Sequence, residues 1–380
     1  MSLKKNLLLI LTLLMVFAGC VGGDSSESGD NQFTSLPEYT LEQVLELSGK
    51  DDVLLGRPNS VVLDSAGNLL VMDLATYSVH VFDDEGIYQT SFGSQGEGPG
   101  EFQQPMRMLL TKQDTLYIND NIRGSLLVYY RNGDYDWEHA YDILLPQSGD
   151  GFPFYSLYPT DEGIPTVFRV RDDSDDYPNG YSTIKFINRN GDITKETDLK
   201  FNNGDVLEVN MNDMQMQIGL SELNSTEIAP HPDGSFIQAW TADPVLYQFS
   251  ADGDTLNTME LEGYPIEPAT SEAVSVLAER YGSGFGNIES GMEEAIGDFF
   301  PAFTDVMVMH DESIWLRKVR TVDTRQSWYH LAPEGVPSGT LLLGENESLR
   351  NAVANHVYVS SEADDGSPVI VKYRLSTSEI

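Results

Sequence analysis

The sequence predicts an all-β fold: a six-bladed β-propeller that is closed by pairing of the two chain ends and carries a helical insertion near residues 267–303. Residues 58–133 contain two copies of one pattern, which repeats at an offset of 47 residues without a gap. Each copy runs strand, tight turn, strand, loop, strand and glycine turn, which is the outline of a four-stranded antiparallel blade. The length outside two insertions accommodates about six such repeats.

The first two blades carry the clearest form of the repeat. Leu69–Asp73 aligns with Leu116–Asp120, and the polar turn before each of these strands aligns as well. A period of this length is typical of propellers and solenoids. The pattern therefore predicts a first blade over about residues 57–92 and a second over about residues 105–141.

The remaining blades follow the pattern more loosely. Pro232–Trp240 matches Ser65–Asp73 at an offset of 167 residues. Seven blades would leave only about 41 residues for each, which the ungapped 47-residue repeat contradicts. Besides the blade around Pro232–Trp240, the sequence predicts a degenerate blade over 155–199, another over 304–343 and a last one over 350–375.

The last blade offers only three strands, and an N-terminal segment has no blade of its own. Leu41–Leu47 alternates imperfectly and fits either a strand or a short helix. We favour a strand, because pairing it with the last blade would remove the exposed edges of an open ring.

The first nineteen residues read as a secretion leader. Lys4 and Lys5 form a charged start, and the apolar run Leu7–Phe17 follows. Phe17-Ala18-Gly19-Cys20 resembles the bacterial lipobox, whose cysteine is lipidated after cleavage. The alternative is a leader cut elsewhere, with Cys20 as a chance thiol. Cys20 is the one cysteine of the chain, which excludes an internal disulfide.

Residues 20–35 read as a flexible tether, because glycine, serine and acidic residues dominate them and little apolar surface is available to bury. Residues 36–380 then form the propeller. Val21 follows the cysteine, so no charged sorting residue stands there. By resemblance to lipoproteins of bacteria with two membranes, this predicts an outer-membrane lipoprotein that faces the periplasm or the surface. The lipid on Cys20 would attach the protein to its partner, the membrane.

The chain is strongly acidic, with 60 Asp and Glu against 22 Lys and Arg and a net charge of -38. Such a field repels nucleic acid and anionic membrane surfaces, so we expect no nucleic-acid partner. Hydrophobic residues make up 40% of the chain, which argues against disorder. The charge is typical of the solvated surface of a halophilic protein; the alternative is a specific acidic site for cations or basic partners.

A glycine-rich link joins the first two blades. Ser91–Phe102 contains four glycines and a proline within ten residues, and no helix pattern follows it, which argues against a nucleotide-binding loop. This link, together with Asp73 and Asp120 at the strand ends, resembles NHL-type six-bladed β-propellers, in particular lipoproteins from Bacteroidetes-like bacteria. The resemblance covers about residues 57–133 and implies interaction more than catalysis.

Two segments do not fit the repeat. The first, about residues 201–220, carries Met211, Met214 and Met216, which form either an adaptable binding surface or ordinary packing. The second, about residues 267–303, reads as two helices, the first capped by Thr270 or Ser271. It is either a packing patch on the propeller or a lid or partner surface.

Candidate binding residues are charged side chains near the ends of inner strands, where groups facing the channel would gather. A second group belongs to a basic cluster in an otherwise acidic chain. The alternatives are structural hydrogen bonds between blades and internal ion pairs. The candidates are Arg57, Asp73, Arg107, Asp120, Arg123, Arg317 and Arg320.

No catalytic residue is predicted, because the sequence lacks the common hydrolase, metalloprotease and EF-hand motifs. The six histidines lack the spacing of a zinc motif, so we predict no cofactor, although calcium or zinc ligands from different blades could meet at the channel without a motif. We expect a binding module for a small ligand or a protein. The alternative is a metal-dependent propeller hydrolase or lyase, similar to lactonases, with its site at the central channel.

Overall fold

The structure is a computed structural model that describes most of the chain after the predicted tether. It describes residues 32–47, 55–146, 151–172, 174–211, 214–281, 287–321 and 323–377. The predicted leader, Cys20 and the tether up to residue 31 lie outside the described residues.

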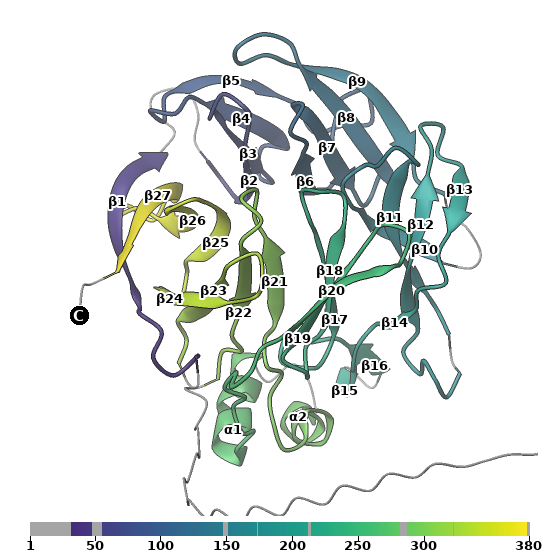
Figure 1. Cartoon of the computed structure of the whole chain (residues 1–380), viewed down its shortest axis with the longest axis vertical. Helices are drawn as coiled ribbons and strands as arrows, with labels where there is room; N and C mark the ends of the chain where they lie inside the picture. The colour runs from purple at the N-terminus through teal and green to yellow at the C-terminus, as the bar shows by residue number, and fades with distance from the viewer. Residues whose placement is uncertain are drawn as a thin grey trace, which may run out of the picture.

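Six antiparallel sheets stand around a common centre (Figure 1), which confirms the predicted six-bladed β-propeller. The first three sheets, blades 1 to 3, follow in chain order. Blade 1 comprises β2 (Pro58–Leu63), β3 (Leu69–Asp73), β4 (Ser78–Phe82) and β5 (Tyr88–Phe92); blade 2 comprises β6 (Pro105–Leu110), β7 (Thr115–Asp120), β8 (Ser125–Arg131) and β9 (Trp137–Leu144); blade 3 comprises β10 (Phe152–Ser156), β11 (Ile164–Val170), β12 (Tyr181–Ile187) and β13 (Ile193–Glu196), with β14 (Phe201–Asn202) beside β12.

Blades 4 to 6 complete the ring, and each predicted repeat corresponds to one sheet. Blade 4 comprises β17 (Thr226–Pro230), β18 (Phe236–Trp240), β19 (Val245–Phe249) and β20 (Thr255–Glu260); blade 5 comprises β21 (Asp305–Val308), β22 (Ile314–Arg317), β23 (Gln326–Leu331) and β24 (Pro337–Leu343); blade 6 comprises β25 (Ser348–Val353), β26 (His356–Glu362), β27 (Pro368–Thr377) and, as its outer strand, β1 (Tyr39–Leu47).

The two chain ends share blade 6, as predicted. β1 pairs antiparallel with β27, from Tyr39 opposite Thr377 to Leu47 opposite Ile370. The last residue of β1, Leu47, is 1% exposed and packs with Leu69 and Phe82 of blade 1. The closing strand therefore completes its own sheet and also part of the contact with the neighbouring sheet.

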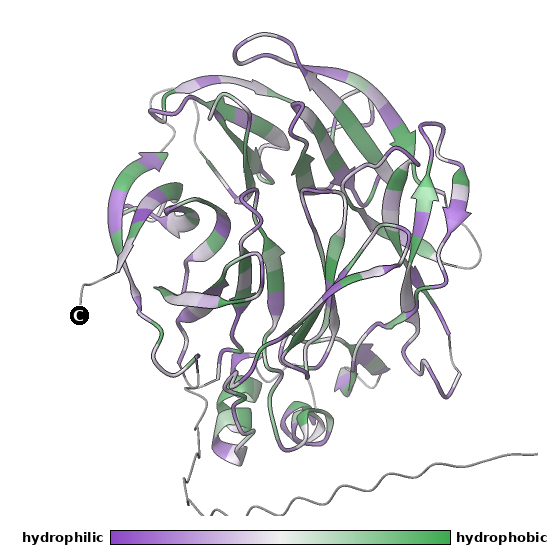
Figure 2. Cartoon of the chain, in the orientation of Figure 1, coloured by the Kyte–Doolittle hydropathy of each residue, from purple (hydrophilic) through white to green (hydrophobic). Residues whose placement is uncertain are grey.

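The hydrophobic core lies between neighbouring blades. The central strands β3 and β4 are buried along their whole length, because both faces of the blade are covered. Leu70 and Val81 of blade 1, for example, pack in one cluster with Met108 and Leu127 of blade 2. Figure 2 shows hydrophobic residues concentrated along the strands that run through the interior of the blades. Each blade thus depends on its neighbours for burial.

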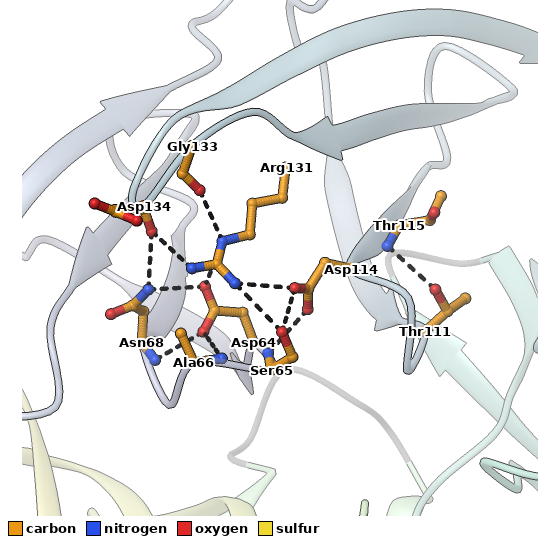
Figure 3. A network of polar contacts seen from close by, with 10 residues as sticks. All are labelled: Asp64, Ser65, Ala66, Asn68, Thr111, Asp114, Thr115, Arg131, Gly133 and Asp134. Atoms are coloured by element: carbon orange, nitrogen blue, oxygen red, sulfur yellow. Dashed lines mark hydrogen bonds and ion pairs between the residues drawn. The ribbon is translucent and has the colours of Figure 1, made fainter.

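A polar network joins blades 1 and 2 at their turns (Figure 3). Arg131, at the end of β8, donates from Nη1 to Asp114 Oδ2 at 3.0 Å, and its Nε lies 3.5 Å from Asp64 Oδ2. The Asp64 carboxylate, which is fully buried, also accepts the backbone N–H groups of Ala66 and Asn68. Since Asp64 belongs to blade 1 and Arg131 to blade 2, one guanidinium holds two blades together.

Both insertions fold against each other beside blades 4 and 5 (Figure 1). The first forms the hairpin β15 (Leu207–Met211) and β16 (Met214–Ile218). The second forms α1 (Ser271–Arg280), which Thr270 caps through a 3.3 Å bond from the Ala273 N–H, and α2 (Ile288–Ile296). Leu207 and Val209 of the hairpin are buried against both helices. Among the described residues, no helix is long and apolar enough to cross a membrane.

Candidate functional site

The central channel opens on the face that carries the insertions. The inner strands β6 and β17 begin on this face, and their antiparallel partners β7 and β18 end there. Blades 2, 3 and 4 enclose a cavity of about 280 Å³ at this end, which we call the mouth cavity. The residues that line the mouth cavity include Met106, Arg107, Asn119, Phe154, Tyr155, Arg169, Ser225 and Glu227.

The mouth cavity is continuous with two further spaces. Met106 and Arg107 also line the deeper channel between the inner strands. Arg169 and Glu227 also line an outer space, which segments 203–206 and 219–221 on either side of the hairpin enclose. Because α1 and α2 pack against that hairpin, the helical insertion supports one wall of the opening.

Two arginines stack on neighbouring aromatic rings of β10. The Arg107 guanidinium lies 4.2 Å from the ring centroid of Tyr155, and the Arg169 guanidinium lies 3.7 Å from that of Phe154. A β-bulge between Pro153 and Tyr155 interrupts the alternation of the strand, so two successive rings reach the same cavity. The rings hold both guanidinium planes while leaving their edges available to donate.

Several buried donors in the cavity have no partner in the part of the chain that the structure describes. Arg107 Nη1, Arg169 Nε and Asn119 Nδ2 are buried, and none has a hydrogen-bond partner among the described atoms. The amide of Asn119 is fixed, because its Oδ1 accepts the Ser156 backbone N–H at 3.2 Å. An unpaired buried donor costs about 1–3 kcal/mol, so three of them in one cavity need an explanation.

One carboxyl group at the cavity has a shifted pKa. Burial, and then the nearby charge of Asp305, raise the pKa of Glu227 from 4.5 to about 7. A 3.0 Å hydrogen bond from Ser225 Oγ and the charges of Arg107 and Arg317 act in the opposite direction. Glu227 therefore changes its charge close to neutral pH.

We expect Glu227→Gln to stabilise the protein relative to wild type above pH 7 and to change its stability little near pH 5. Between its ordinary pKa of 4.5 and about 7, the folded state keeps a proton that the unfolded chain has lost. Wild-type stability therefore falls as pH rises through this window, whereas the glutamine variant lacks that loss. Urea unfolding of both proteins at pH 5, 6, 7 and 8 measures it. A stability difference that is the same at every pH would contradict the prediction.

Arg317, a sequence candidate, lines the outer space. Its Nε donates to Thr304 Oγ1 at 3.1 Å, and its Nη2 lies 3.7 Å from Asp305 Oδ2, the residue opposite it in the sheet. Nearby, burial and then the positive charge of Arg317 lower the pKa of Arg350, which lines the deeper channel. Arginines from four blades thus surround the channel.

Other candidates lie away from the mouth cavity and make structural bonds. The buried Asp73 carboxylate accepts the backbone N–H groups of Gly56, Arg57 and Ala75. Asp120, at the same place in the second repeat, accepts three as well. The Arg57 side chain is exposed beside this loop. Each aspartate thus holds the chain segment that enters its blade.

The last two candidates also bind backbone. Arg123 donates from Nη1 to the carbonyl oxygens of Gly98 and Glu101, both at 2.8 Å, and from Nη2 to Asp142, so it holds the glycine-rich link against blade 2. Arg320 donates to the Thr324 carbonyl at 3.4 Å, next to α1. Of the seven candidates, the structure brings only Arg107 and Arg317 to the channel.

Sequence reasoning missed Arg169, Asn119, Phe154, Tyr155 and Glu227. A signal existed for Glu227, which lies 167 residues after Ser60, just as Arg107 lies 47 residues after it. Both take the position of the inner strand that faces the mouth. Among the described residues, no three His, Cys, Asp or Glu side chains lie close enough together to hold a metal ion.

Comparison with known proteins agrees with the fold. Residues 24–203, slightly under half of the chain, match the model of a family described as 6-bladed beta-propeller. A protein described as exported, from Bacteroides fragilis, is 13% identical with a TM-score of 0.55, and the match covers 90% of this chain and 96% of that one. A member of the DUF4221 family from Bacteroides vulgatus is 10% identical with a TM-score of 0.52, over 90% and 100% of the two chains. No curated protein sequence matches.

Proposed function

We propose that this six-bladed β-propeller is a lipid-anchored binding module of the cell envelope, which takes a small ligand into its channel mouth. The observation that carries the proposal is the mouth cavity, where donors from blades 2 and 3 meet without partners among the described residues. Cavities of roughly 300 Å³ and above, lined by aromatic groups and a few convergent polar groups, are typical ligand sites. The rigid blades place these groups, and the supported hairpin forms one wall.

The proposed location rests on the predicted leader and on a protein of similar structure. Cys20 follows a charged start and an apolar run, and Val21 lacks a sorting charge. A similar propeller, that from Bacteroides fragilis, is described as exported. We infer attachment to the outer membrane through a lipid on Cys20, with the acidic body standing off the membrane on the tether.

A Cys20→Ser variant of the full chain is expected to move from the membrane fraction to the soluble fraction when expressed in a bacterium with two membranes. The thiol is the atom to which the lipid would be joined, and no helix among the described residues is long and apolar enough to cross a membrane in its place. Cell fractionation measures the location of the protein, and the mass of the N-terminal peptide shows whether it carries a lipid. Val21→Asp serves as a control that keeps the lipid and shifts the protein toward the inner membrane. Wild type whose N-terminal peptide carries no lipid would overturn the anchor.

The binding proposal is tested with a panel of small molecules read by thermal unfolding. Met106→Trp would fill the mouth, because Met106 lines the cavity and is 42% exposed. Ile122→Trp is the matched control, since Ile122 is 65% exposed beyond the end of β7 and does not line the cavity. The panel comprises neutral sugars, amino acids, carboxylates, phosphates and sulfates at matched ionic strength.

We expect at least one panel member, at about 100 times its Kd, to stabilise wild type and Ile122→Trp by about 2.7 kcal/mol, which raises Tm by several degrees. Met106→Trp should show no such increase. A panel that gives no increase, or one that Met106→Trp retains in full, would refute binding at the mouth.

A further inference from the structure

We propose that the channel mouth binds the oxyanion of a small molecule, a carboxylate, phosphate or sulfate group, between Arg107, Arg169 and Asn119. This inference deepens the proposed function and rests on it. The three unpaired buried atoms in the cavity are all N–H donors: Arg107 Nη1, Arg169 Nε and Asn119 Nδ2. A group that offers several acceptor oxygens in a small volume would satisfy them together.

The donors come from adjoining strands and are held in place. Arg107 and Asn119 are direct partners across β6 and β7, and Arg169 is the second-last residue of β11 in the next blade. Rings of β10 support both guanidiniums, and the Tyr155 hydroxyl donates to the Ile228 carbonyl at 2.7 Å, which fixes one ring. Preorganised donors lose little freedom when an anion arrives.

The charge of the two arginines is unusual for this chain. Carboxylates outnumber basic residues by 60 to 22, yet neither Arg107 nor Arg169 forms an ion pair within 4.0 Å in the part of the chain that the structure describes. Burial lowers the pKa of Arg169, while the charges of Tyr155 and Glu227 raise it. Two positive groups that form no ion pair within this distance, in so acidic a chain, favour an anion that comes from outside.

Glu227 makes this binding dependent on pH. Its neighbours at the cavity are Ser225, Asp305, Arg107, Arg169, Arg317 and Tyr155. When Glu227 is ionised, it offers negative charge to the same cavity and opposes a second anion. Affinity for an anion should therefore fall as pH rises through about 7, the pKa of Glu227.

The test is titration calorimetry of the intact folded chain with sodium phosphate, sodium sulfate and sodium acetate, each against sodium chloride at equal ionic strength. We expect at least one of the three to bind with one-to-one stoichiometry. Arg169→Gln and Arg107→Gln should weaken it at least about tenfold, as the loss of a charged hydrogen bond does. Arg169→Lys keeps the charge, so weaker binding by that variant identifies the planar fork as the requirement.

The matched control is Arg57→Gln, which removes an exposed arginine from the same face and should leave affinity unchanged. Glu227→Gln should bind more tightly than wild type at pH 8 and equally at pH 5.5. Thermal unfolding of each variant establishes that it is folded. Equal weakening by Arg57→Gln and Arg169→Gln would reduce the effect to non-specific attraction and overturn the inference.

The two proposals fail in different ways. If none of the three anions binds, but a neutral member of the panel binds wild type and not Met106→Trp, the anion site is wrong and the binding module stands. If no member of the panel and no anion binds, both fall. Acetate alone would identify a carboxylate, and phosphate or sulfate alone a tetrahedral anion.

Discussion

Leu47→Ala is expected to lower the free energy of unfolding by about 2–5 kcal/mol, the range for removing a buried leucine side chain. Leu47 ends the closing strand, is 1% exposed and packs in one cluster with Leu69, Phe82 and Ile370. The substitution would open a cavity where β1, blade 6 and blade 1 meet. Loss of the β1 contact would then expose the edge of β27.

Equilibrium unfolding in urea, followed by far-ultraviolet circular dichroism, measures this change. Val44→Ala is the matched control, because Val44 lies in the same strand, is 43% exposed and should cost no more than about 0.5 kcal/mol. If both variants unfolded at the same urea concentration as wild type, β1 would contribute nothing to closure and the ring would be held by other contacts.

Arg131→Met is expected to cost about 3 kcal/mol, the lower end of the range for breaking a buried ion pair, because the arginine is 16% exposed. Methionine keeps much of the apolar stem but leaves the fully buried Asp64 and the nearby Asp114 without their cation (Figure 3). Arg131 also donates to the Gly133 and Asp134 carbonyls, which hold its own turn.

The same network should show a pH dependence. Burial alone would raise the pKa of Asp114, but hydrogen bonds from Ser65 and Arg131 outweigh burial and hold that pKa below its usual 3.8. The stabilisation is therefore present above about pH 4 and is lost as pH falls through the lowered pKa. The difference between wild type and Arg131→Met should shrink in that acid range.

A surface ion pair gives the comparison for this experiment. Arg325 Nη2 lies 2.7 Å from Asp323 Oδ2, but both side chains are 55% exposed. Arg325→Met should therefore lower the free energy of unfolding by at most about 1 kcal/mol. Equal costs for Arg131→Met and Arg325→Met in urea unfolding would contradict the role of burial.

The repeat explains why the ring could be predicted from the sequence alone. Blades 1 and 2 align without a gap, and pairing the N-terminal strand with the three-stranded last blade was the arrangement that removes the exposed edges. Each blade has about the same length because its neighbours impose the same packing on it. The fold class therefore followed from periodicity, without any information about single side chains.

The site was less predictable, since several of its residues come from blade 3, where the sequence repeat is degenerate. Blade 3 follows the repeat only loosely in sequence, so Phe154, Tyr155 and Arg169 could not be aligned with blades 1 and 2, although the bulge in β10 has equivalents in β2 and β6. Arg107 and Glu227 share a register position but differ in charge. Arg123 lies near the same face, but its side chain binds the glycine-rich link.

The pairing of Tyr39 with Thr377 leaves the first residue of β1 and the last residue of β27 side by side. A short linker between them would produce a chain without ends, and cutting it in an exposed link between two other blades would yield a circular permutant. In such a permutant all four strands of blade 6 would be continuous, and the point of entry into the ring would lie elsewhere. The order of the blades around the channel, and hence the neighbours of Arg107, would be unchanged.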